Sequence, residues 1–96
     1  METPVISNDV LARYASDAAL EVDGVSGLTR DAADVSAADG RVDIAVHVEL
    51  AWGAGAAEIA QRVQARVSEY VEGMANVQIG SVDVIVERVG APPAKQ

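Results

Sequence analysis

The sequence has 96 residues, enough for one domain with a modest core, and aliphatic side chains must build that core because only 3% of the residues are aromatic. The formal net charge is −8 and the seven basic residues are scattered, which disfavours binding to phosphate backbones or anionic lipids. The absence of cysteine excludes disulfides, thiol catalysis and thiolate metal sites.

The chain begins with a short extended lead-in, residues 1–6, followed by the first predicted helix. Ser7 is a suitable N-cap, and Asp9 lies in the first turn, where the helix dipole favours an acid. Apolar and small side chains then recur at helical spacing from Asn8 to about Glu21. The sequence therefore predicts a helix that ends in a glycine-containing loop.

A hairpin is predicted next. Asp39 and Gly40 form a two-residue turn signal between the weakly hydrophobic segment Ala33–Ala38 and the segment Arg41–Ala51. The second segment alternates with period two, as expected for a strand with one apolar face. We expect Ala33–Ala38 to be an edge strand, antiparallel to Arg41–Ala51. The apolar face of the longer strand consists of Val42, Ile44, Val46, Val48 and Leu50.

A second helix and a last strand complete the chain. From Ala56 to Gly73 the apolar residues follow a helical period, and Asn76 can close this helix. The segment Ser81–Val89 again alternates, after an expected kink at Gly80. A strand, helix and strand of these lengths favour a right-handed crossover with parallel strands. The valines expected to face the helices are Val82, Val84 and Val86.

The predicted order is helix-strand-strand-helix-strand, which indicates an α+β fold. We expect a two-layer sandwich with two helices on one face of a three-stranded mixed sheet. Residues 7–89 would form this single domain, and the polar, proline-containing residues 90–96 a disordered tail. The other sheet face has no predicted cover, so we expect it to serve self-association or partner contact. It would carry Asp43, Ala45, His47, Glu49, Ala51, Asp83, Ile85 and Glu87.

No catalytic, cofactor or metal site is predicted. His47 is the only histidine, and Glu49 on the same face is its expected hydrogen-bond partner, but no nucleophile or pocket accompanies them. The turn Gly53–Gly55 resembles a dinucleotide-binding turn, yet Glu58 stands where the third glycine is needed. A calcium loop is equally unsupported by the spacing of Asp31, Asp34 and Asp39.

Trp52, the only tryptophan, has two interpretations. Aromatic side chains are mostly buried, which favours packing over the end of the second helix. Tryptophan is also enriched at interface hot spots, so an exposed anchor is the alternative. The residues that we select as partner contacts are His47, Glu49, Trp52 and Ile85.

Five segments carry a family resemblance through their order and spacing: Ile6–Ala15, Ala19–Leu28, Val42–Gly53, Glu58–Val67 and Val82–Val86. Together they resemble the alkaline-shock-protein family of bacterial envelope stress response proteins. The similarity extends over nearly the whole chain. It departs from the family pattern in loops, for example where proline is common at position 23 and in the turn Gly55–Ala57.

The resemblance implies a non-enzymatic cytoplasmic protein that acts in cell-envelope homeostasis and in the response to alkaline or cell-wall stress. Some members of the family sit at the membrane through a membrane-anchored partner protein. The family has no agreed catalytic residues, so none is transferred to this chain. We therefore expect protein partners, with self-association as a further possibility, no cofactor, no nucleic acid, and no direct membrane insertion.

Two other function classes remain as alternatives. Small sheets backed by helices can bind RNA, which makes a small nucleic-acid-binding regulatory domain the second hypothesis, although the acidic charge opposes it. A small enzyme is the weakest hypothesis, because the sequence shows no constellation of catalytic residues.

Overall fold

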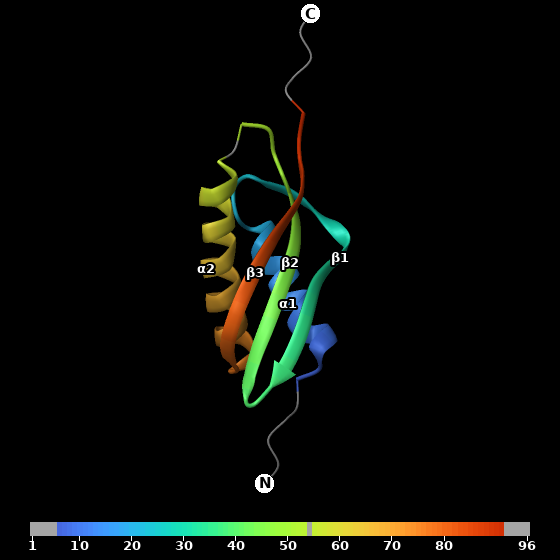
Figure 1. Ribbon diagram of the computed structural model, residues 1–96. Coiled ribbons are helices and arrows are strands. Elements are labelled where there is room, and N and C mark those ends of the chain that lie inside the picture. Colours follow the sequence, from blue (N-terminus) through green and yellow to red (C-terminus); the bar gives the residue numbers. More distant parts are fainter. Residues whose placement is uncertain (1–5, 54, 92–96) are drawn as a thin grey trace, which may run out of the picture.

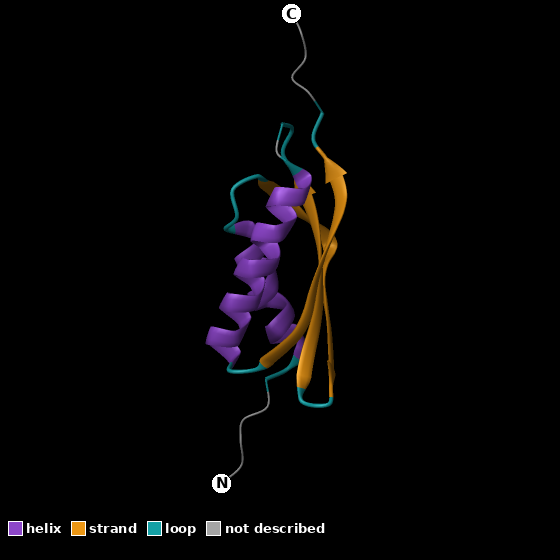
Figure 2. Cartoon of the chain, turned by 60° about the vertical axis from the view of Figure 1, so that its left-hand side comes forward, coloured by secondary structure: helices purple, strands orange, loops and turns teal. Residues whose placement is uncertain are grey.

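The computed structural model describes residues 6–53 and 55–91, and it is a two-layer α+β sandwich (Figure 1). The elements follow the predicted order: α1 (Asn8–Leu20), β1 (Val25–Ala38), β2 (Arg41–Leu50), α2 (Ala56–Ala75) and β3 (Gln78–Val89). Both helices lie on the same side of the sheet, and no described residue outside the strands forms a layer on the opposite side (Figure 2). The predicted fold class is confirmed, whereas most of the predicted lead-in and tail lies outside the described residues.

The sheet is mixed, with β2 in the middle. β1 pairs antiparallel with β2, and β3 pairs parallel with β2 on its other side. The hairpin turn at Asp39 and Gly40 has positive φ at both residues, 53° and 77°, as a two-residue turn that matches strand twist requires. Its closing pair is Ala38 and Arg41, which fixes the register of the rest of the hairpin.

Helix α1 begins, and helix α2 ends, where the local chemistry indicates. The Ser7 side chain accepts a hydrogen bond from the backbone N–H of Val10 and so caps α1. Helix α2 ends at Asn76, whose left-handed conformation (φ 55°) lets its N–H bond to the carbonyl of Glu72. The two helices run side by side. The rings of Tyr14 and Tyr70 pack edge to face, with their centroids 6.0 Å apart.

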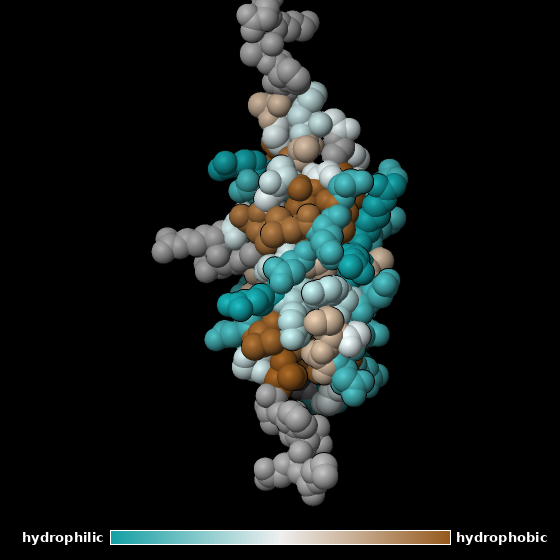
Figure 3. Space-filling view, turned by 180° about the vertical axis from the view of Figure 1, so that it is seen from behind, coloured by the Kyte–Doolittle hydropathy of each residue, from teal (hydrophilic) through white to brown (hydrophobic). Residues whose placement is uncertain are grey.

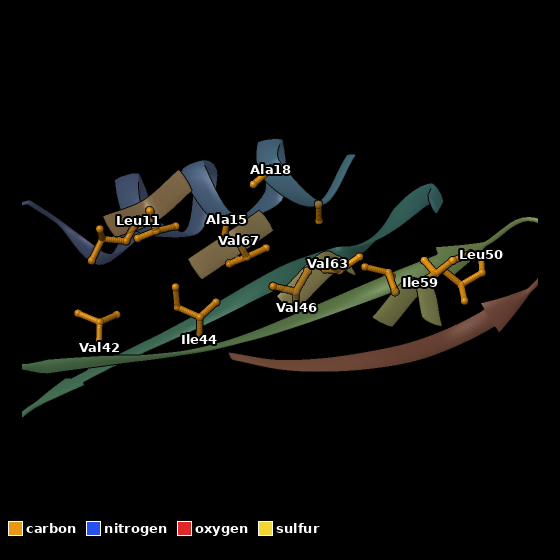
Figure 4. Packing of buried hydrophobic residues seen from close by; sticks show 13 residues of the cluster. Leu11, Ala15, Ala18, Val42, Ile44, Val46, Leu50, Ile59, Val63 and Val67 are labelled. Carbon is orange, nitrogen blue, oxygen red and sulfur yellow. The ribbon is translucent and has the colours of Figure 1, made fainter. Parts of the chain in front are cut away.

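The core lies between the helices and the inward face of the sheet (Figure 4). All five residues of the predicted apolar face of β2 are buried, together with the stripe of α2 and the small residues of α1. The alanines of α1 leave no long side chain in the way, so this helix packs close to the strands. The buried residues from the helices are Leu11, Ala15, Ala18, Ala19, Ile59, Val63, Val67 and Val71.

The first strand departs from its predicted boundaries. β1 begins at Val25 rather than Ala33, and its pairing with β2 is interrupted between Leu28 and Ala33. The prediction was too short because this irregular stretch breaks the period-two alternation on which a strand assignment rests. Two other boundaries differ slightly from the prediction. Helix α2 continues to Ala75 rather than Gly73, and β3 begins at Gln78 rather than Ser81.

Gly80 is the site of the predicted kink. It is an extra residue in β3, since Ile79 pairs with Val42 and Ser81 already pairs with Asp43. A side chain at Gly80 would place its Cβ 2.5 Å from the Oδ1 atom of Asp43, so the Asp43 carboxylate would have to move to accommodate it. None of the helices in the described ranges is long and apolar enough to cross a membrane.

Candidate functional site: the open face of the sheet

The sheet face away from the helices, here called the open face, is the candidate functional surface (Figure 2). Odd-numbered residues of β2 lie on it, because the even-numbered ones are buried against the helices. The register adds residues of both neighbouring strands: Ile85 pairs with His47, Asp34 pairs with Ala45, and no helix covers these side chains. The sequence predicted this uncovered face, and the structure confirms it.

His47 lies at the centre of the open face between two carboxylates from different strands. Its Nδ1 atom is 3.2 Å from Oε1 of Glu87 on β3, and its Nε2 atom is 3.5 Å from Oδ2 of Asp34 on β1. Neighbouring side chains shield the imidazole, which keeps 26% of its side-chain surface exposed. A protonated imidazole can donate to both carboxylates at once, whereas a neutral one donates to only one. His47 thus connects all three strands.

This arrangement differs from the predicted pairing of His47 with Glu49. Both residues lie on the open face, but they are two positions apart on one strand, and the cross-strand neighbours reach the imidazole instead. The two carboxylates approach opposite ring nitrogens, so a single metal ion could not be held by all three groups. Accordingly, the described residues contain no cluster of three or more groups with the geometry of a metal site.

A bulge near the end of β3 decides which charges reach the open face. Val86 pairs with Val48, and the next pair is Arg88 with Glu49, so Glu87 is an extra residue. Without the bulge Arg88 would point to the helix side. With it, Glu87 contacts His47 and Arg88 lies on the same face as Glu87. Sequence reasoning missed Arg88 because no turn residue marks this bulge.

Asp34 was also missed as a residue of this surface. A signal for it existed: the hairpin turn pairs Ala38 with Arg41, and counting back by two residues each time leads to Asp34 opposite Ala45. The sequence analysis placed Asp34 in the predicted edge strand Ala33–Ala38 but considered its side chain only as a calcium ligand. The structure places it in a strand, with 74% of its side-chain surface exposed.

Acids dominate the open face. The described side chains that lie on it include five carboxylates, those of Asp34, Asp43, Glu49, Asp83 and Glu87. Two arginines accompany them, Arg41 next to the hairpin and Arg88 near the opposite end. The central part therefore carries carboxylates around His47 and the half-buried Ile85. Such a surface attracts cationic groups and repels phosphate.

Trp52 does not join the other predicted contact residues. It lies in the turn after β2 with 56% of its surface exposed, so the favoured interpretation, packing over the end of α2, is wrong. The chain after β3 runs beside this turn, because the N–H of Gly90 donates to the carbonyl of Leu50. Val89, 46% exposed, adds apolar surface at the same end of the sheet. His47, Glu49 and Ile85 form one patch, and Trp52 belongs to another.

The helix side has a different character. Seen from that side, apolar surface gathers in two areas separated by hydrophilic side chains (Figure 3). Exposed apolar residues of the helices include Val10, Leu20 and Met74. Arg66 ties the helix layer together through its bonds to the carboxylate of Glu21, at 2.9 and 3.2 Å. These bonds hold the two helices together. We therefore take the open face, where carboxylates from all three strands gather, as the candidate binding surface.

Comparison with solved structures shows the fold alone. The chain is similar to the MamM CTD in its copper form, with a TM-score of 0.68, 19% identity, and coverage of 92% of each chain. A histidine-to-alanine variant of the MamM CTD gives a TM-score of 0.61 at 17% identity, covering 85% of this chain and 98% of the other. The nickel form of a glutamate-to-histidine variant of the MamM CTD gives a TM-score of 0.59 at 16% identity, covering 83% of this chain and 96% of the other.

The sequence comparisons address the family directly. No functionally curated protein shows significant similarity to this chain. A family model matches residues 30–91, which is well over half of the chain and includes β2, β3 and the larger part of β1. That family is called Asp23, a name unrelated to residue 23 here, and is described as having a cell envelope-related function. The chain belongs to this family, the alkaline-shock-protein family that its sequence motifs resemble.

Proposed function

We propose that this protein is a non-enzymatic interaction module of the cell-envelope stress response and docks a basic segment of a protein partner on its open face. The observation that carries the proposal is the group of carboxylates around His47 and Ile85 on a sheet face without cover. Family membership supports the connection to the envelope. A cytoplasmic protein with this surface would reach the membrane through a membrane-anchored partner.

The surroundings of His47 support a binding role rather than catalysis. A general base needs a free ring nitrogen directed at the proton that it abstracts. Both ring nitrogens of His47 face carboxylates, so neither is directed at a substrate or at a nucleophile of the described residues. Charge complementarity with a basic segment would instead increase the association rate and orient the partner.

Site-specific crosslinking in cells tests the proposal. A photo-crosslinking residue at Ile85 reports on the open face, and the same residue at Arg62, on the exposed side of α2, is the matched control. We expect position 85 to capture a membrane-anchored protein with a basic segment, and Ile85→Lys to abolish this capture in an otherwise folded protein. Capture from position 62 alone, or capture that nuclease removes, would contradict the proposal.

Self-association is a second proposal, and a separate observation favours it. Trp52 and Val89 expose apolar surface at the end of the sheet, whereas two open faces would bring carboxylates against carboxylates. We therefore propose that copies of the chain meet through this apolar end. Sedimentation velocity over a range of concentrations tests it: Trp52→Ser should shift the chain toward the monomer, and an unchanged distribution would argue against this contact.

A further inference from the structure

We propose that the partner segment binds as an extended fourth strand along the free edge of β3, with basic side chains over the open face. This inference rests on the proposed function and names the form of the ligand. β3 has a strand neighbour only on the β2 side among the described residues, so the backbone groups on its other edge have no strand to pair with. Proteins use such edges to bind peptides by strand addition.

The edge is suited to strand addition between its two bulges. Ser81 to Val86 pair with β2 in continuous register, which leaves six residues of regular strand. This is about the length of an average strand in a globular protein. The other edge strand, β1, also pairs in continuous register over six residues, Ala33 to Ala38, so the choice of β3 rests on the groove beside it and on its acidic side chains. The side chains of β3 in this stretch alternate between the helix side and the open face, so an added strand would meet both surfaces.

A groove on the helix side would receive side chains of the added strand that lie beside the first half of β3. It has a volume of about 450 Å³ and lies between α2 and the first half of β3. Its wall on α2 consists of small or polar side chains, which favours small residues such as alanine, serine or valine at these positions. The residues from α2 are Gln61, Gln64, Ala65 and Ser68, and those from β3 include Ile79 and Val82.

The open face would receive the remaining side chains. Asp83 lies on β3 itself, and Glu87 follows at the bulge, so a lysine or arginine on an added strand would face carboxylates. Cross-strand pairs of opposite charge stabilise a sheet. The ligand class is therefore an extended segment that alternates basic residues with small apolar ones.

A second copy of β3 fits this edge less well. If two β3 strands paired antiparallel about Ile85, Asp83 of each copy would stand opposite Glu87 of the other. Like charges directly opposite each other destabilise a strand pair. The charges of the edge thus favour a basic partner over self-pairing.

One side chain already occupies part of the edge strand's hydrogen-bonding capacity. The Nε2 atom of Gln64 on α2 donates to the carbonyl of Val82 at 2.9 Å. An incoming strand that uses this carbonyl must displace Gln64, so the bond competes with binding. Gln61 lines the same groove without bonding to that carbonyl, which makes it a matched control.

The test uses an eight-residue peptide of alternating lysine and valine, with the affinity measured by fluorescence anisotropy at low salt. Its controls are a block peptide of the same composition and the alternating peptide methylated at every backbone nitrogen. We expect the alternating peptide to bind at least about tenfold more tightly than either control, because only it can form a strand with one basic face. Gln64→Ala should strengthen its binding severalfold, and Gln61→Ala should leave it unchanged.

The outcomes separate the two proposals. Slowed amide exchange in β3 upon binding, but not in β1, supports the added strand. If all three peptides bind equally and Asp83→Asn with Glu87→Gln weakens all of them, the acidic docking face stands and strand addition is overturned. If none of the peptides binds, both proposals are overturned. Protection of β1 instead of β3 would overturn the assignment of the edge.

Discussion

The imidazole of His47 and the carboxylate of Glu87 lie 3.2 Å apart although 40 residues separate them in the sequence. Glu87 is the extra residue of a bulge in β3, between the pairs Val48–Val86 and Glu49–Arg88. A regular strand would have directed Glu87 to the open face as well, but without Arg88 beside it. The local backbone irregularity therefore sets the charge pattern around the only histidine.

The two faces of the sheet should respond differently to the same substitution. Ile44 is 1% exposed on the helix side, whereas Ile85 is half-buried on the open face. Ile44→Ala should lower the free energy of unfolding by about 2–5 kcal/mol, since it leaves a cavity in the core. Ile85→Ala should cost less than about 1 kcal/mol, because solvent and neighbouring side chains fill the space. Urea denaturation measures both, and equal costs would contradict the sidedness of the sheet.

Gly80 should be intolerant of a side chain because of Asp43. Gly80→Ala places a Cβ against the Asp43 carboxylate, which must rotate away and lose its bond from Ser81. We expect a loss of about 1 kcal/mol, the usual contribution of one hydrogen bond. The loss of unfolding free energy caused by Gly80→Ala should be smaller in an Asp43→Ala background. A double-mutant cycle, measured by denaturation, detects this difference. Gly73→Ala is the control: it meets open space in a helix and should stabilise the protein.

The end of α2 depends on a left-handed residue. Asn76 has φ 55°, a conformation that glycine adopts freely and alanine does not. Asn76→Ala should therefore lower the melting temperature, at a cost of about 1–2 kcal/mol, and Asn76→Gly should leave it nearly unchanged. Thermal unfolding followed by circular dichroism compares the two variants. A similar loss in both would show that the asparagine side chain, rather than the backbone conformation, closes the helix.

Charge on the open face should control the rate of partner binding. Reversing Asp83 and Glu87 to lysine removes attraction at the proposed docking site, and reversing Glu69 and Glu72 on α2 changes the net charge equally. With the alternating lysine-valine peptide, the first variant should lower the association rate about tenfold or more, and the second only slightly. Stopped-flow fluorescence measures this at low salt. Equal reductions would mean that net charge, rather than the open face, attracts the peptide.

Much of the fold could be predicted from local sequence patterns. The period-two alternation of β2 and the helical stripe of α2 each specify one buried face, because side-chain direction is set by the backbone geometry of the element. Asp39 and Gly40 fixed the hairpin, and Ser7 and Asn76 marked helix ends, since these positions need particular backbone conformations or hydrogen-bond acceptors. The uncovered sheet face followed from counting helices and strands.

Irregular backbone and exposure could not be predicted in the same way. The interrupted pairing of β1 and the bulge at Glu87 insert residues into strands, and insertion is decided by how neighbouring strands fit together. Trp52 is exposed because the turn that carries it extends beyond the helix layer, which no local pattern reveals.

The sequence by itself thus determined the elements, their order and the face that each one buries, because hydrophobic periodicity is a local property of the chain. Only the tertiary structure decided that Asp34 and Glu87 meet at His47, that Arg88 turns to the open face, and that β3 offers a free edge beside a groove. These features depend on strand register, and register is a relation between segments distant in sequence.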